Sequence, residues 1–122
     1  NYFIGEHDFS SFCSKNSSVE DKVREIYHFN MYYDKGNPHV INFDICGNGF
    51  LYNMVRIIIG TIQDVAAGKY EAEYVKEILD KKERKYAGPK ADAAGLYLKE
   101  VIYNNEEINK FIKEGLARYE NI

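Results

Sequence analysis

One segment limits what this chain can fold into more than any other, the apolar stretch at residues 50–67. Its large apolar side chains recur at intervals of three and four positions, which predicts a long helix with one broad buried face. These residues are Phe50, Leu51, Met54, Val55, Ile58, Ile62 and Val65. Gly68 follows them, and glycine often ends a helix. Such a helix gains most of its stability from packing against a second layer.

The segments on either side of this helix predict strands. Residues 23–33 alternate loosely, with the odd-numbered positions on one face. Residues 39–46 are rich in β-branched and aromatic side chains. A turn at residues 34–38 joins the two segments, so we expect a hairpin. Residues 96–103 predict one further strand.

Other periodic segments predict helices. An amphipathic helix is expected over residues 70–82 and a last helix over residues 106–119. A short helical turn is expected at residues 5–12, with Asp8 as its cap. Strands and helices follow one another irregularly, and an antiparallel hairpin comes early. This order predicts the α+β class, a mainly antiparallel sheet with helices packed on one face.

Composition narrows the class of protein. A chain of 122 residues with 45% hydrophobic positions has the size of one domain with one core. We therefore expect a single domain over residues 1–122, in which residues 105–122 form a C-terminal helical extension. No apolar run approaches the roughly 18 residues of a membrane span, and two cysteines suit the reducing cytoplasm. A net charge of −3 argues against binding nucleic acid by bulk charge alone.

Arg56 is the residue whose position packing explains least. It lies within the most apolar predicted helix and has no acidic residue three or four positions away. It belongs to a narrow polar stripe formed by Tyr52, Asn53, Arg56, Gly60 and Gln63. Gly60 is expected to leave space beside the guanidinium, which would need a carboxylate or a phosphate from elsewhere. A salt bridge to Asp8, Asp44 or Asp92, or simple exposure to solvent, would also satisfy it.

Gly47-Asn48-Gly49 stands between a predicted strand and the long helix, as a dinucleotide-binding fingerprint would. The third small residue of that fingerprint is absent, because Tyr52 occupies its place. We therefore interpret the two glycines as easing a tight turn.

Basic side chains cluster after the second predicted helix. They are Lys81, Lys82, Arg84, Lys85 and Lys90. Such a cluster suits either contacts with nucleic-acid phosphates or a solvated helix end, where positive charge complements the helix dipole. The three histidines lack the spacing of metal ligands, so no metal site is expected.

Several segments, taken together, are similar in order and spacing to a known family. They are residues 5–12, 24–26, 47–60 and 94–98, and the most specific is Phe50-Leu51-Tyr52-Asn53-Met54-Val55-Arg56 followed by Gly60. Over about residues 3–104 the chain resembles the C-terminal half of the bacterial tRNA pseudouridine synthase A family, the TruA type.

The resemblance implies an isomerase that converts uridines of the tRNA anticodon stem-loop (positions 38–40 in the family) to pseudouridine without a cofactor. It matches Arg56 to the active-site arginine that pairs with the catalytic aspartate, and Leu96 to an apolar residue of the uracil pocket. Tyr52 and Asn53 would bind substrate beside them. It also implies tRNA as partner, no membrane, a cytoplasmic location and a homodimer.

The chain departs from the family at the nucleophile. The family's catalytic aspartate lies in a Gly-Arg-Thr-Asp motif of the N-terminal half, and none of the seven aspartates here follows Arg-Thr. We therefore expect this chain to be the C-terminal half of a longer synthase and to be inactive alone. It should also self-associate through the apolar surface that the missing N-terminal half would cover.

A non-catalytic RNA-binding module is the alternative. Aromatic side chains on its strands would stack on bases, and the candidates are Tyr27, Phe29, Phe43 and Tyr97. The negative net charge and the lack of an RNP-type segment argue against it. A Gly-Arg-Thr-Asp motif in the same polypeptide would decide for the synthase.

Overall fold

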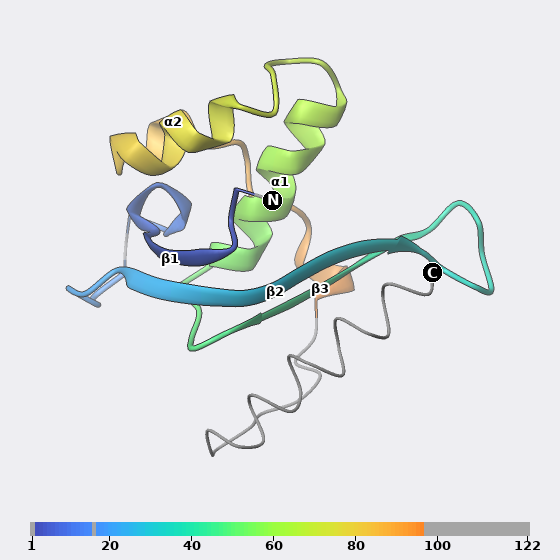
Figure 1. Ribbon diagram of the computed structural model, residues 1–122, viewed down its shortest axis with the longest axis horizontal. Coiled ribbons are helices and arrows are strands. Elements are labelled where there is room, and N and C mark those ends of the chain that lie inside the picture. The colour runs from blue at the N-terminus through green and yellow to red at the C-terminus, as the bar shows by residue number, and fades with distance from the viewer. Residues whose placement is uncertain (1, 16, 97–122) are drawn as a thin grey trace.

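The computed structural model describes residues 2–15 and 17–96, and the predicted α+β class is confirmed there (Figure 1). Its strands are β1 (Gly5–Asp8), β2 (Val23–Tyr33) and β3 (Ile41–Gly47). They form one antiparallel sheet in the order β1-β2-β3. Its helices are α1 (Met54–Ala66) and α2 (Tyr74–Lys81), and both lie on the same face of the sheet.

The predicted C-terminal elements fall outside this part of the chain. Of the strand expected at 96–103, only Leu96 is described, and the helix expected at 106–119 lies wholly outside. The same holds for the extension over residues 105–122. Within the described ranges, no helix is both long and apolar enough to cross a membrane.

The hairpin of β2 and β3 is confirmed, but its simple alternation is not. The pairing runs from Tyr33 opposite Ile41 to His28 opposite Cys46, and the register then shifts before Ile26. Such a bulge adds one residue to a strand and reverses which positions face the core. Ile26 and Phe29 therefore both face the helices, although one is even-numbered and the other odd.

The segment Gly5–Asp8 is a strand, so the helical turn predicted over residues 5–12 is wrong for its first half. β1 pairs with β2, with Gly5 opposite Ile26. Only Ser10–Phe12 forms a helical turn, the 3-10 turn η1. Asp8 holds this turn, since its Oδ1 accepts a hydrogen bond of 2.9 Å from the Ser10 N–H. A four-residue strand depends on its neighbour, and its own sequence carries too little periodicity to reveal it.

Helix α1 begins at Met54 and not at Phe50 as predicted. Asn53 has a φ of +60°, which lies in the left-handed region and interrupts a right-handed helix. The chain before it forms a turn, closed by the Met54 N–H donating to the Leu51 carbonyl at 3.0 Å. The predicted end is confirmed, because Gly68 has a φ of +81° just after the helix.

Helix α2 also begins later than predicted, at Tyr74 and not at Tyr70. The preceding residues form turns in which N–H groups bond to carbonyls three residues back. The Tyr74 N–H donates to the Glu71 carbonyl at 3.0 Å, and the Val75 N–H donates to the Ala72 carbonyl at 3.1 Å. The amphipathic pattern therefore extends over a tighter turn that is not yet α-helix.

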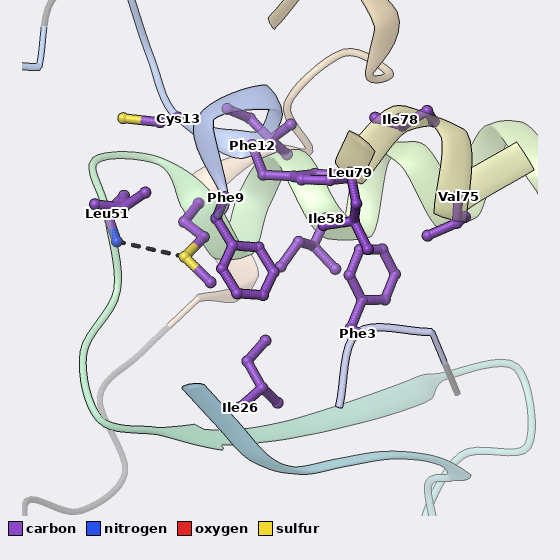
Figure 2. Packing of buried hydrophobic residues seen from close by; sticks show 12 residues of the cluster. Phe3, Phe9, Phe12, Cys13, Ile26, Leu51, Ile58, Val75, Ile78 and Leu79 are labelled. Atoms are coloured by element: carbon purple, nitrogen blue, oxygen red, sulfur yellow. Dashed lines mark hydrogen bonds between the residues drawn. The ribbon is translucent and has the colours of Figure 1, made fainter. Parts of the chain in front are cut away.

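The core lies between the helices and the sheet (Figure 2). Three phenylalanines fill it, Phe3, Phe9 and Phe12, and the rings of Phe3 and Phe12 meet edge to face at 5.3 Å between centroids. Ile58 of α1 and Ile78 of α2 pack around them and are fully buried. This packing fixes the rotation of α1 about its axis and so decides where its polar stripe lies.

Candidate functional site

Arg56 is half-buried on α1, and neutral oxygen atoms hold its guanidinium. Its Nε donates to the carbonyl of Ala91 at 2.8 Å, and its Nη1 donates to Asn53 Oδ1 at 3.3 Å. None of the carboxylates in residues 2–15 and 17–96 forms an ion pair with it. The salt bridges considered with Asp8, Asp44 and Asp92 are therefore not formed, and Nη2 makes no hydrogen bond to this part of the chain.

Asn53 connects Arg56 to the loop that follows η1. Its Nδ2 donates to Ser14 Oγ at 2.8 Å while its Oδ1 accepts from Arg56. The Ser14 N–H donates in turn to the Tyr52 carbonyl at 3.1 Å. Asparagine is one of the few residues that adopts the left-handed conformation readily. One residue thus ends the turn before α1 and fixes one side of the guanidinium.

Gly60 does not leave open space beside the guanidinium, as the sequence led us to expect. A Cβ at this position would lie 1.5 Å from the carbonyl oxygen of Pro89, so the loop backbone occupies that space. The Ala91 N–H donates to the Arg56 carbonyl at 2.9 Å, and the Gly88 N–H donates to Thr61 Oγ1 at 2.9 Å. Glycine is needed here for close approach of two backbones, and the same loop presents the carbonyl that holds Arg56.

Tyr52 and Leu96, the two large side chains predicted to bind substrate, are open to solvent. They are 61% and 50% exposed respectively. Tyr52 directly precedes Asn53, which holds the guanidinium. Leu96 directly follows the 3-10 turn η3 (Ala93–Gly95), and that turn begins two residues after Ala91. Each of the two segments that fix Arg56 therefore also carries an exposed apolar or aromatic side chain.

The predicted basic cluster divides in two. Lys82, Arg84 and Lys85 line one open hollow of about 360 Å³, whereas Lys81 and Lys90 do not. The Lys81 ammonium lies over the Tyr86 ring, 4.3 Å from its centroid. Lys90 is exposed in the loop after Pro89.

Lys15 and Lys22 line the same hollow and were not found from the sequence. They stand about sixty residues before the basic cluster, in a stretch that also contains acids. Only the fold brings them together, since η1 contacts both α2 and the 3-10 turn η2 (Arg84–Tyr86). No local sequence pattern could have shown this contact.

Electrostatic contacts favour the charged form of one lysine of the hollow, Lys85. The nearby Tyr86 phenol and the Glu83 carboxylate raise the pKa of the Lys85 ammonium. Lys85 Nζ lies 3.5 Å from Glu83 Oε2. Arg84 Nη1 donates to the Gly88 carbonyl at 2.9 Å, which fixes its guanidinium against the loop next to α1.

The base-stacking platform of the alternative RNA-binding module is not formed as expected. Phe29 stacks on Phe3 at 5.7 Å between centroids and meets Phe43 edge to face at 6.2 Å, so it belongs to the core side of the sheet. Tyr27 is half-buried, and Tyr97 lies outside the described residues. In residues 2–15 and 17–96 no group of three histidine, cysteine or acidic side chains could hold a metal ion.

Comparison with known proteins identifies the family to which this arrangement belongs. The sequence model of the tRNA pseudouridine synthase family matches residues 1–104. tRNA pseudouridine synthase A 1 of Bacillus cereus is 51% identical over 104 residues, which are 85% of this chain and 41% of that protein. tRNA pseudouridine synthase A of Bacillus pumilus is 48% identical over the same length, with the same shares.

A clostridial relative gives the same result. tRNA pseudouridine synthase A of Clostridium kluyveri is 48% identical over 102 residues, 84% of this chain and 41% of that protein. The chain thus spans about two fifths of the length of the curated relatives that it matches. Since a family model covers most of the chain and identity is near one half, the chain belongs to the tRNA pseudouridine synthase family.

Proposed function

We propose that this chain supplies the arginine side of the active site of a tRNA pseudouridine synthase, and that the catalytic aspartate comes from an N-terminal half. One observation carries the proposal. The Arg56 guanidinium is half-buried and held in place by Ala91 and Asn53, yet it has no carboxylate partner in the described ranges. A charge in that state is stabilised by an anion from another segment.

An aspartate placed against the free edge of this guanidinium would gain two properties. The positive charge favours the ionised form of the carboxyl group, and the planar fork of N–H donors aligns it. In the reaction the carboxylate initiates cleavage of the bond between N1 of the base and C1′ of the ribose, and the detached uracil rotates. A bond then forms between C1′ and C5, the C5 hydrogen leaves to solvent and N1 gains a proton. Arg56 supports this sequence by keeping the aspartate charged and oriented.

The exposed side chains near Arg56 suit the substrate base. We assign Leu96 to the uracil pocket and Tyr52 and Asn53 to substrate contacts beside it. The substrate is a uridine of the tRNA anticodon stem-loop. The complete enzyme would act as a homodimer in the cytoplasm, and this chain alone would be inactive, because it carries no aspartate in the required motif.

The test measures tritium release from C5 of uridine in tRNA labelled with 5-³H-uridine. The chain is assayed alone and joined to the N-terminal part of the Bacillus cereus relative, with that intact relative as the positive control. We expect release from the joined protein and none from the chain alone. Release from the chain alone would place the nucleophile among its own aspartates. A folded joined protein that binds tRNA but releases no tritium would favour the non-catalytic RNA-binding module.

A further inference from the structure

The hollow beside η1 gathers positive charge from segments that are far apart in sequence. Among the residues that the structure describes, its basic side chains are Lys15, Lys22, Lys82, Arg84 and Lys85, and its one carboxylate is Glu83. Figure 1 shows why these residues meet, since the carboxyl end of α2 lies beside η1. In a chain of net charge −3, such a local excess of positive charge is unusual.

Two of these cations are free to bind an anion. Lys15 and Lys82 are exposed, and within residues 2–15 and 17–96 their ammonium groups form no hydrogen bond or ion pair. The one carboxylate among the described lining residues already has a partner, because Glu83 lies against Lys85. The hollow therefore presents unneutralised charge to solvent.

Lys82 occupies a position that the fold alone would give to glycine. It follows the last residue of α2 with a φ of +56°, in the left-handed region. Glycine is the usual residue there, because it has no Cβ to clash. The Lys82 side chain at this position lies at the rim of the hollow.

The wall of the hollow is connected to the Arg56 site in two ways. Ser14 lines it and accepts the hydrogen bond from Asn53, which holds the guanidinium. Arg84 lines it too and donates to Gly88, at the start of the loop that presents the Ala91 carbonyl. Hydrogen bonds therefore join the wall of the hollow to both groups of residues that hold the Arg56 guanidinium.

We infer that this hollow binds backbone phosphates of the tRNA whose uridine is presented to Arg56, with Lys15 and Lys82 as its main contacts. The inference rests on the proposed function. Lysines act on phosphates as point charges and carry no base specificity, so they would position the RNA without selecting its sequence. Lys15 and Lys22 thereby extend the basic surface beyond the cluster found in the sequence.

The experiment measures tRNA affinity by fluorescence anisotropy between about 50 and 200 mM salt, with the joined protein described above. The variant K15E/K82E is compared with the matched control K35E/K76E, which makes the same charge change at exposed lysines outside the hollow. We expect at least tenfold weaker binding for K15E/K82E at low salt and a salt slope smaller by about 1.5. The control should change affinity less than threefold.

A second variant separates binding from folding. K82G relieves the left-handed strain, so we expect an unchanged or higher urea midpoint together with weaker tRNA binding. Equal effects of the two double variants, no effect of K15E/K82E, or no tRNA binding by the unsubstituted protein would overturn the inference. If K15E/K82E weakens tRNA binding but the unsubstituted joined protein releases no tritium, the proposed function is contradicted and the phosphate site is still supported. Normal tritium release together with an unchanged tRNA affinity of K15E/K82E would support the proposed function and contradict the phosphate site.

Discussion

The guanidinium of Arg56 shows which contacts of a single residue can be predicted from a sequence. Its place among apolar neighbours, without an acid one turn away, predicted a partner from elsewhere. The nearest acceptor is the carbonyl of Ala91, 35 positions along the chain. A backbone carbonyl has no signature in a sequence, so that contact could not be predicted. The polar stripe did include Asn53, although its left-handed conformation became visible only in the structure.

The planar fork of Arg56 should be necessary and not only its charge. In Arg56→Lys one ammonium cannot bond to Ala91 and Asn53 and still present two parallel donors to a carboxylate. We expect the rate of tritium release by the joined protein to fall at least about 100-fold, while tRNA affinity stays within threefold. Gln63→Ala, an exposed position of the same stripe, serves as the control and should keep its rate. A parallel loss of affinity would make Arg56 an RNA anchor and contradict its role beside the aspartate.

The types of the secondary-structure elements were predicted better than their boundaries. The long helix, the second helix and the hairpin are all present, because apolar periodicity determines them. The starting residues of α1 and α2 and the strand β1 were missed, since each depends on a local backbone conformation or on pairing with a distant strand. The packing of the loop at residues 88–91 against α1 was also not predicted. The need for glycine at position 60 is visible only in the structure, where the carbonyl of Pro89 occupies the space of a Cβ.

Gly60→Ala should therefore destabilise the protein, although alanine is the better helix former. In an open helix this change gains about 1 kcal/mol. Here the new methyl would overlap Pro89, and overpacking costs about 1–3 kcal/mol or more. We expect a lower urea midpoint and slower tritium release, because the displaced loop also carries the Ala91 carbonyl. Gly95→Ala, where none of the described residues lies within 4 Å of the added atom, is the control. Equal midpoints for the two variants would disprove the close packing.

At the scale of the whole molecule, the described part is asymmetric, because the hairpin of β2 and β3 extends past α1 and α2 (Figure 1). At the far end of the hairpin Met31 is 63% and Tyr33 is 70% exposed, and Ile41 lies opposite Tyr33 in the neighbouring strand. The sequence predicted this hairpin, but not how much of it the helices cover. Helices α1 and α2 cover only the part around Ile26 and Phe29.

This uncovered end should make the chain associate with itself. Adjacent apolar side chains on strands form the kind of patch that a monomer rarely exposes. We expect the apparent mass of the isolated chain in sedimentation velocity to rise with protein concentration over the micromolar to millimolar range. The association should persist at high salt, because salt does not screen apolar burial. Met31→Lys should lower that mass, whereas Val19→Lys, an equally apolar exposed position away from the hairpin, should not. A chain that stays monomeric throughout would contradict this prediction, and an association that salt abolishes would show that charge and not the apolar patch governs it.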